Sequence, residues 1–323
     1  MSVDPVKEFL RFLTTHAIRV RDFDELRTKI VKIKTEGLEQ FQVVSDFDKT
    51  MTPQWLRDPC SKTGALITCH SSYSIIEHGD SVSEKYRKRC RELADQYIPL
   101  ENDHRLSPEE RVKMNWEWHT QGHASMLEEN LNRESLKKIV HDSWKSMQIH
   151  LRDNTRDFFK LLEKNRVPTT VLSAGLRDVI ETILVLEDIL SEISDQTDEE
   201  IDHLLMIVGN RLEFDINGKH VGFSKPAILP HNKKDAVAQL LRKSAIRTVR
   251  PNALLLGDFP HDVDFVHLIP NLDEYVAIGF LADRPHDDGA ALNEYLKHFD
   301  IVVTGGHASM QVAVEFLKCL EHR

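Results

Sequence analysis

The chain is 323 residues long, with 41% hydrophobic residues, 29% charged residues and a formal net charge of −10. This composition is typical of a globular protein, and the length predicts two domains or one large domain with an insertion. The acidic balance argues against a nucleic-acid polymer as partner, because such binding depends on lysines and arginines that neutralise phosphates. No apolar run approaches the roughly 20 residues that span a bilayer, so no membrane partner is expected.

The N-terminal segment MSVDPVKEFLRFL does not resemble a secretory signal, because it has no basic flank followed by an apolar block. Four cysteines, Cys60, Cys69, Cys90 and Cys319, follow no regular spacing. So few irregularly placed cysteines fit a reducing compartment. We therefore predict a cytoplasmic protein.

Helical periodicity begins the chain, over residues 6–20 and 23–37, and Gly37 is a natural residue for the end of the second helix. The apolar residues 41–45, FQVVS, then predict a short buried strand. Asp46 and Asp48 follow this strand directly. Their position is informative, because ligands of open α/β sheets bind at the carboxyl ends of the strands.

Residues 53–150 are predicted to be a helical insertion. Apolar residues recur at helical spacing over 81–97, 107–119 and 132–147, and Ser107, Pro108 and Glu110 form the start of a capped helix. The basic run EKYRKRCR inside this insertion is interpreted mainly as a solvated helix face, with guidance of anionic substrates as the alternative.

From Thr155 onward, helices and strands alternate. Strands are expected over 168–174, 203–210, 252–258, 274–282 and 301–306, and helices over 155–165, 176–188, 233–245, 291–299 and the C-terminal residues. Asn217-Gly218 predicts a hairpin turn. The alternation predicts an α/β fold with a Rossmann-like, mostly parallel sheet and helices on both faces.

Polar side chains follow several of these strands: Asp46 and Asp48, Ser173 in VLSAG, and Asp258 with Asp262, while Lys233 begins a helix. Each of these features alone is weak evidence of a catalytic site, since an acidic pair after a strand is often a solvated turn and a serine is often a helix cap. Parallel strands would bring them together. A phosphate ester would then find carboxylates for Mg²⁺ on Asp46 and Asp258, and a hydroxyl and an ammonium for its oxygens on Ser173 and Lys233.

The segment DFDKTMT permits two assignments of the attacking group, either Asp46 with Asp48 two residues on, or Asp48 with Thr50 two residues on. DFDKTM resembles motif I of the haloacid dehalogenase-like hydrolases, VLSAG motif II, Lys233 motif III and GDFPHD motif IV, in the family's order. The resemblance implies the first assignment. The alternative, a P-type ATPase motif, is disfavoured by Pro53 and by the lack of membrane spans.

This resemblance implies an aspartyl-phosphate intermediate on Asp46, with Asp48 as general acid and base. It implies a magnesium site of Asp46, Asp48, Asp258 and Asp262, and phosphate binding by Ser173, Ala174, Gly175 and Lys233. The implied domains are a catalytic core of residues 38–52 and 151–323 and a cap of residues 53–150 that selects the substrate. Residues 1–37 form N-terminal helices that pack on either the cap or the core.

The segments YIPLEND, NWEWHTQGH, VLSAGLRDV, HNKKDA and LLLGD resemble the cytosolic type III pyrimidine 5′-nucleotidases, including relatives that prefer 7-methylguanosine phosphate. The resemblance implies that Glu101 and Trp118 meet the base; a structural role in the helical cap is the alternative for Trp118. Gly122 and His119 depart from the family pattern. We predict a Mg²⁺-dependent nucleoside 5′-monophosphate phosphatase for pyrimidine nucleotides, 7-methyl-GMP or both. The alternatives are a small-metabolite phosphatase and a non-catalytic binding protein.

Overall fold

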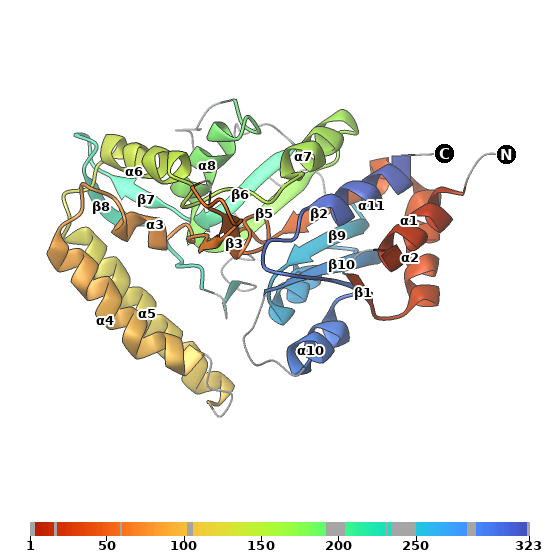
Figure 1. The fold of residues 1–323 in the computed structure, drawn as a ribbon, viewed down its shortest axis with the longest axis horizontal. Helices are drawn as coiled ribbons and strands as arrows, with labels where there is room; N and C mark the ends of the chain where they lie inside the picture. The colour runs from red at the N-terminus through yellow and green to blue at the C-terminus, as the bar shows by residue number, and fades with distance from the viewer. Residues whose placement is uncertain are drawn as a thin grey trace.

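The computed structural model describes most of the chain (Figure 1). The described residues are 4–15, 18–58, 60–101, 106–191, 204–229, 232–233, 250–282 and 289–321. Apart from Lys233, the helix predicted over 233–245 lies outside them. Among the described helices, none is long and apolar enough to cross a lipid bilayer.

The helical and strand segments follow each other in the predicted alternation. The helices are α1 (Pro5–Thr15), α2 (Phe23–Glu36), α3 (Ser74–Glu77), α4 (Glu84–Glu101), α5 (Pro108–Leu127), α6 (Arg133–Lys145), α7 (Thr155–Lys164), α8 (Arg177–Leu186), α10 (Ala290–His298) and α11 (Gln311–Glu321), with 3-10 segments η1 (Leu38–Gln40) and η2 (Pro260–Leu268). The strands are β1 (Ile18–Val20), β2 (Phe41–Ser45), β3 (Trp55–Arg57), β4 (Leu66–Thr68), β5 (Thr169–Leu176), β6 (Leu205–Asn210), β7 (Leu212–Phe214), β8 (His220–Phe223), β9 (Asn252–Gly257), β10 (Glu274–Leu281) and β11 (Ile301–Thr304).

Seven strands form one sheet in the order β1-β11-β10-β9-β2-β5-β6. All neighbouring pairs are parallel except β1 with β11. In the interior of the sheet, Val43 of β2 is in register with Leu254 of β9 and Thr169 of β5. The mostly parallel sheet is therefore confirmed, and β2 lies between β5, which contains Ser173, and β9, which Asp258 follows.

Helices cover both faces of the sheet, as predicted. Successive residues of a strand point to opposite faces, so Val43 belongs to a buried cluster that includes residues of α1, α7, α8 and α11, whereas Val44 belongs to a second cluster with η2 and α10. Both faces are thus buried, which explains why β2 and β9 read as continuous apolar runs rather than alternating ones.

The N-terminal segment corrects one prediction. The helix expected over residues 6–20 ends at Thr15, and Ile18–Val20 forms the edge strand β1, antiparallel to β11. The physical reason is tertiary. Pairing with β11 satisfies the backbone N–H and C=O groups of residues 18–20, which a local helical pattern does not reveal, and the β-branched Ile18 and Val20 favour a strand. Helix α1 contacts α11, and α2 contacts β10, so these two helices pack against the seven-stranded sheet and a helix that covers it.

Residues 53–150 contribute α4 and α5, which pack side by side and project away from the sheet (Figure 1). The predicted capping box of Ser107 and Glu110 is present at the start of α5. The segment is not wholly helical, however, because β3 and β4 form a two-stranded antiparallel ribbon. The main-chain N–H groups of Gln54 and Trp55 donate to the carbonyl oxygen of Gly306, at 2.7 and 3.1 Å, so a long-range contact holds this ribbon.

Candidate active site

Three carboxyl groups meet at the carboxyl ends of β2 and β9. Asp46 follows β2, Asp258 follows β9, and Asp262 lies in η2. Ligand oxygens of these three residues lie within 4.8 Å of one another. Asp46 and Asp258 are therefore close enough to share one cation, which is the geometric condition that the sequence-based hypothesis of a metal-dependent enzyme requires.

Lys233 supplies the positive charge in contact with this acidic group. Its Nζ lies 2.9 Å from Oδ1 of Asp46 and 3.0 Å from Oδ1 of Asp262. Burial alone would lower the pKa of the Lys233 ammonium, but the neighbouring carboxylates of Asp262 and Asp46 raise it above its usual value. Lys233 is therefore a permanent cation beside Asp46 at any physiological pH.

Asp258 and Asp262 are buried near other carboxylates, and a divalent cation would offset the resulting repulsion. Burial, together with repulsion by Asp46 and Asp262, raises the pKa of Asp258 well above its usual value. Burial likewise raises the pKa of Asp262 to about 6, although Lys233 opposes the rise. Carboxylate oxygens are the ligands that Mg²⁺ and Ca²⁺ prefer. This set of donors thus fits a hard divalent cation bound by oxygen ligands.

Asp262 is fixed by the loop after β9. The main-chain N–H groups of Asp258 and Phe259 donate to Oδ2 of Asp262, at 3.2 and 3.0 Å. Gly257 permits this approach, because a Cβ atom on it would lie 2.5 Å from the Cβ of Asp262. Sequence reasoning did not single out Gly257; its place directly before the acidic motif is the signal that could have found it.

Asp48 is held separately from the three-acid group. The N–H and the hydroxyl of Ser72 donate to its two carboxylate oxygens, at 2.9 and 2.7 Å. Burial raises the pKa of Asp48, and the hydrogen bonds from Ser72 oppose part of the rise. Ser72 was missed by sequence reasoning, since a serine in the run HSSYS carries no motif and the contact spans 24 residues.

The VLSAG segment lies against Ser72 and Asp48. Ser173 is buried within β5, and its Oγ accepts a hydrogen bond from the N–H of Gly175 at 3.0 Å. A Cβ on Gly175 would lie 2.1 Å from Oγ of Ser72 and 2.8 Å from Oδ2 of Asp48. Glycine is therefore required here for close packing. The carbonyl of Ala174 accepts from the side-chain amide of Asn210 at 2.7 Å.

The predicted base-binding residues lie on the projecting helix pair. Trp118 of α5 is partly buried, and its ring stacks on Tyr97 of α4 with centroids 5.7 Å apart. Trp116 is on another side of the helix and is 52% exposed. Glu101 is the last residue of α4, and its side chain lies outside the described part of the chain.

An uncharged aromatic cluster connects α5 to the surroundings of Asp48. The Oη of Tyr73, the residue after Ser72, lies 2.8 Å from Nε2 of His123, and the His123 ring stacks on Phe223 of β8. Burial lowers the pKa of His119 to about 4 and that of His123 to about 3. Both rings are therefore neutral at physiological pH, so His119, one of the two departures from the family pattern, adds no charge.

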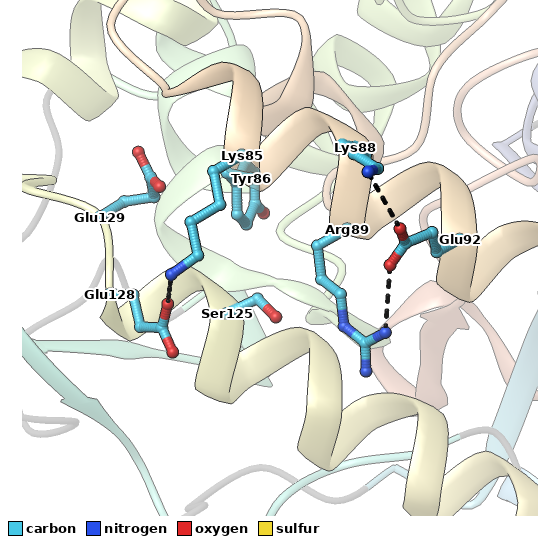
Figure 2. A pocket seen from close by; sticks show the side chains of 8 residues that line it. All are labelled: Lys85, Tyr86, Lys88, Arg89, Glu92, Ser125, Glu128 and Glu129. Atoms are coloured by element: carbon cyan, nitrogen blue, oxygen red, sulfur yellow. Dashed lines mark hydrogen bonds and ion pairs between the residues drawn. The ribbon is translucent and has the colours of Figure 1, made fainter.

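The basic run on α4 lines a separate hollow of about 340 Å³ between α4 and α5 (Figure 2). Lys85 lies 2.6 Å from Glu128, and Lys88 and Arg89 lie 4.0 and 3.3 Å from Glu92. The exposed Lys85 and Lys88 and the half-buried Arg89 are already paired, and none of the predicted site residues lines the hollow. The solvated helix face is thus the interpretation that the contacts favour.

The sheet is mostly parallel, an Asp-x-Asp pair follows one interior strand, and further acids follow the neighbouring strand. This arrangement defines a hydrolase of the haloacid dehalogenase-like class, as the four motifs predicted. The family model of pyrimidine 5′-nucleotidases matches residues 62–321. The chain therefore belongs to the pyrimidine 5′-nucleotidase family. The predictions of a phosphoric monoester hydrolase and of a nucleotide substrate are confirmed at the level of this family.

Individual relatives agree. The chain is 30% identical over 294 residues to 7-methylguanosine phosphate-specific 5′-nucleotidase A of Xenopus laevis, covering 91% of this chain and 92% of the relative. It is 28% identical to the 7-methylguanosine phosphate-specific 5′-nucleotidase of Drosophila melanogaster, covering 96% and 89%. A crystal structure of cytosolic 5′-nucleotidase IIIB bound to cytidine superposes with a TM-score of 0.77 and 26% identity, covering 97% of both chains.

Proposed function

We propose that the protein is a Mg²⁺-dependent nucleoside 5′-monophosphate phosphatase that acts on pyrimidine nucleotides, on 7-methyl-GMP or on both, through a phosphorylated Asp46. The observation that carries the proposal is the meeting of Asp46, Asp258 and Asp262 beside Lys233, with Asp48 held apart by Ser72. The substrate class is supported by the names of the relatives and by the cytidine bound to the similar structure. We also propose a cytosolic location, in keeping with a relative named putative cytosolic 5′-nucleotidase 3.

We propose that Asp46, Asp258 and Asp262 hold the magnesium ion. When bound, the ion supplies positive charge that offsets the repulsion between the anionic phosphate and the attacking carboxylate. The family resemblance also implies Asp48 as a metal ligand. Because Asp48 lies outside the group of three converging acids, accepts hydrogen bonds from Ser72 and has a raised pKa, we assign it to proton transfer.

In the first step, a carboxylate oxygen of Asp46 attacks phosphorus while the bond from phosphorus to the 5′ oxygen breaks. The leaving oxygen takes its proton from Asp48, and the raised pKa of Asp48 favours the protonated acid that this step needs. Lys233, together with Ser173, Ala174 and Gly175, binds the phosphoryl oxygens. The ammonium of Lys233, 2.9 Å from Asp46, also orients the attacking carboxylate.

In the second step, the ionised Asp48 removes a proton from water, and the water oxygen attacks the phosphorus of the aspartyl phosphate. The bond from phosphorus to Asp46 breaks, inorganic phosphate leaves, and the Asp46 carboxylate is restored. Asp48 has then regained its proton. The α4–α5 pair, which carries Trp118 and Glu101, would bind the nucleoside and exclude water from the site.

One panel of substrates tests the proposed function. Phosphate release is measured from CMP, UMP, AMP, GMP, 7-methyl-GMP and ribose 5-phosphate, with Mg²⁺ and with a chelator. We expect turnover of CMP, UMP or 7-methyl-GMP that depends on Mg²⁺ and exceeds turnover of AMP and ribose 5-phosphate. Equal rates on all phosphates would instead indicate a small-metabolite phosphatase, and no release from any would indicate a binding protein.

Ser72→Ala should slow the chemistry that depends on Asp48. The variant removes one donor to the Asp48 carboxylate and the acceptor for the N–H of Leu176. We expect kcat for a nucleotide to fall by about 10-fold or more, as part of the 100-fold or larger contribution of a positioned general acid. The rate of phosphoenzyme formation should fall less with 4-nitrophenyl phosphate, whose leaving group needs no proton, whereas hydrolysis of the phosphoenzyme needs Asp48 with either substrate.

Ser71→Ala is the matched control, because the Ser71 hydroxyl contacts Ser74 and not Asp48. It should retain the wild-type ratio of the two rates of phosphoenzyme formation. An equal loss of this rate on both substrates in Ser72→Ala would contradict the role of Ser72 in orienting the acid.

Trp118→Ala should weaken binding of the base. Removal of a stacked ring costs about 1 to 3 kcal/mol of binding for a nucleobase, so KM for the nucleotide should rise while KM for ribose 5-phosphate stays close to its wild-type value. The comparison on one variant also controls for loss of the Tyr97 contact. Trp116→Ala, which changes an exposed ring on another face of α5, should leave both constants unchanged. A parallel rise for both substrates would show that Trp118 only supports the helix pair.

A further inference from the structure

Arg152 lies at the junction between residues 53–150 and α7, and it is only 4% exposed. Its guanidinium donates to three main-chain carbonyl oxygens: Nε to Thr50 at 2.8 Å, Nη2 to Lys49 at 2.7 Å and Nη1 to Ala308 at 2.6 Å. Its own N–H donates to the carbonyl oxygen of Met51 at 2.8 Å. Four hydrogen bonds of one residue thus end on the segment after Asp48 and on the loop after β11.

The segment that Arg152 holds has an unfavourable backbone conformation. Lys49 has a φ of +63°, in the left-handed region that residues other than glycine seldom adopt. Such conformations persist only where the surrounding structure fixes them. The hydrogen bonds from Arg152 to the carbonyl oxygens of Lys49 and Thr50 fix this conformation. Lys49 directly follows Asp48, the proposed general acid.

The charge of Arg152 is not explained by an ion pair. Within the described part of the chain it has no carboxylate in salt-bridge contact, and its guanidinium lies over the ring of Phe280, 4.5 Å from the centroid. Burial lowers the pKa of Arg152 to about 10, and Asp258 opposes the fall, so the side chain is charged at neutral pH. A buried cation without an acidic partner is costly, which indicates that its carbonyl contacts serve a purpose.

We infer that Arg152 is a positioning residue of the active site, whose guanidinium fixes the carbonyl groups of Lys49 and Thr50 and thereby the angle at which Asp46 and Asp48 meet the phosphoryl group. This inference deepens the proposed function and rests on it for its effect on rate. The planar guanidinium has five N–H donors and can therefore donate to three carbonyl oxygens at once. Lysine, with one ammonium on a flexible chain, keeps the charge and cannot reproduce these three directions.

The test compares Arg152→Lys and Arg152→Met with the wild type, and uses Arg156→Lys as control, since Arg156 is an exposed arginine of α7 that pairs with Glu187. Rates are normalised to the folded fraction from thermal unfolding. We expect kcat to fall by about 100-fold in both Arg152 variants, the scale for a misplaced catalytic group, with KM little changed. Wild-type kcat per folded molecule in Arg152→Lys would overturn the inference, because charge alone would then suffice.

A second measurement does not depend on activity. Amides of Thr50, Met51 and Thr52 donate to the carbonyl oxygen of Phe47, so peptides spanning 46–52 report on the segment by hydrogen exchange. We expect faster exchange there in both Arg152 variants and no change in Arg156→Lys. Unchanged exchange would overturn the inference even if the enzyme were active. An inactive wild type with faster exchange in the variants would overturn the proposed function and leave the positioning role supported.

Discussion

Asp46→Asn is expected to abolish turnover and phosphoenzyme formation together. The amide has the shape of the carboxylate but is not a nucleophile, so loss of the attacking group should lower kcat by at least about 10⁴-fold. The wild type, given a nucleotide with labelled phosphate and quenched during turnover, should carry label that hydroxylamine releases, as expected of an acyl phosphate. The variant should carry none.

Two further variants make the test specific. Asp48→Asn should form the phosphoenzyme from 4-nitrophenyl phosphate and hydrolyse it slowly, because only the second step then needs the missing base. Asp264→Asn changes an exposed acid of the same η2 segment that carries Asp262 and should behave as the wild type. Retention of steady-state turnover in Asp46→Asn would refute the assignment of the nucleophile.

Removal of divalent cations is expected to cause the second large loss. Without a cation, Asp46, Asp258 and Asp262 repel both each other and an incoming phosphate, with Lys233 as the contacting counter-charge. We expect a chelator to reduce kcat/KM at least about 100-fold, and added Mg²⁺ to restore it. The ligands must be ionised to bind the ion, and the pKa of Asp262 is raised to about 6. The Kd for Mg²⁺ should therefore rise as the pH falls through about 6.

The Kd is measured by titration calorimetry at a series of pH values between about 5 and 8. Asp262→Asn is the matched variant: it should bind Mg²⁺ more weakly at every pH, and its Kd should depend less on pH across that range, because one of the titrating ligands is gone. Full activity in the presence of chelator would contradict the assignment of the three acids to a metal site.

Local patterns predicted the elements that carry these groups. The run FQVVS followed by two acids, and NALLLG followed by a third, mark strand ends regardless of what surrounds them, because a strand buried on both faces must be apolar throughout. The capping box at Ser107 and the turn at Gly218, with a φ of +76°, are likewise decided within a few residues. The order of motifs then indicated which ends belong together.

Other features depend on partners distant in the chain. Ile18–Val20 continues a helical pattern and becomes a strand because β11 offers an edge. Ser72 reaches Asp48, and Arg152 reaches Lys49 and Ala308, across 24, 103 and 156 residues. Neither a serine in a polar run nor a single arginine before a helix has a periodicity or spacing that distinguishes it from a surface residue.

The sequence by itself determined which acids, which lysine and which strand ends could build a phosphatase site. Only the tertiary structure decided how those groups are held. Ser72 donates to the carboxylate of Asp48, Gly257 leaves room for Asp262, and Arg152 donates to the carbonyl oxygen of Lys49. The reason is physical. Strand and cap propensities act over a few neighbouring residues, whereas hydrogen bonds that orient a buried side chain depend on which distant segments the folded chain brings within about 3 Å.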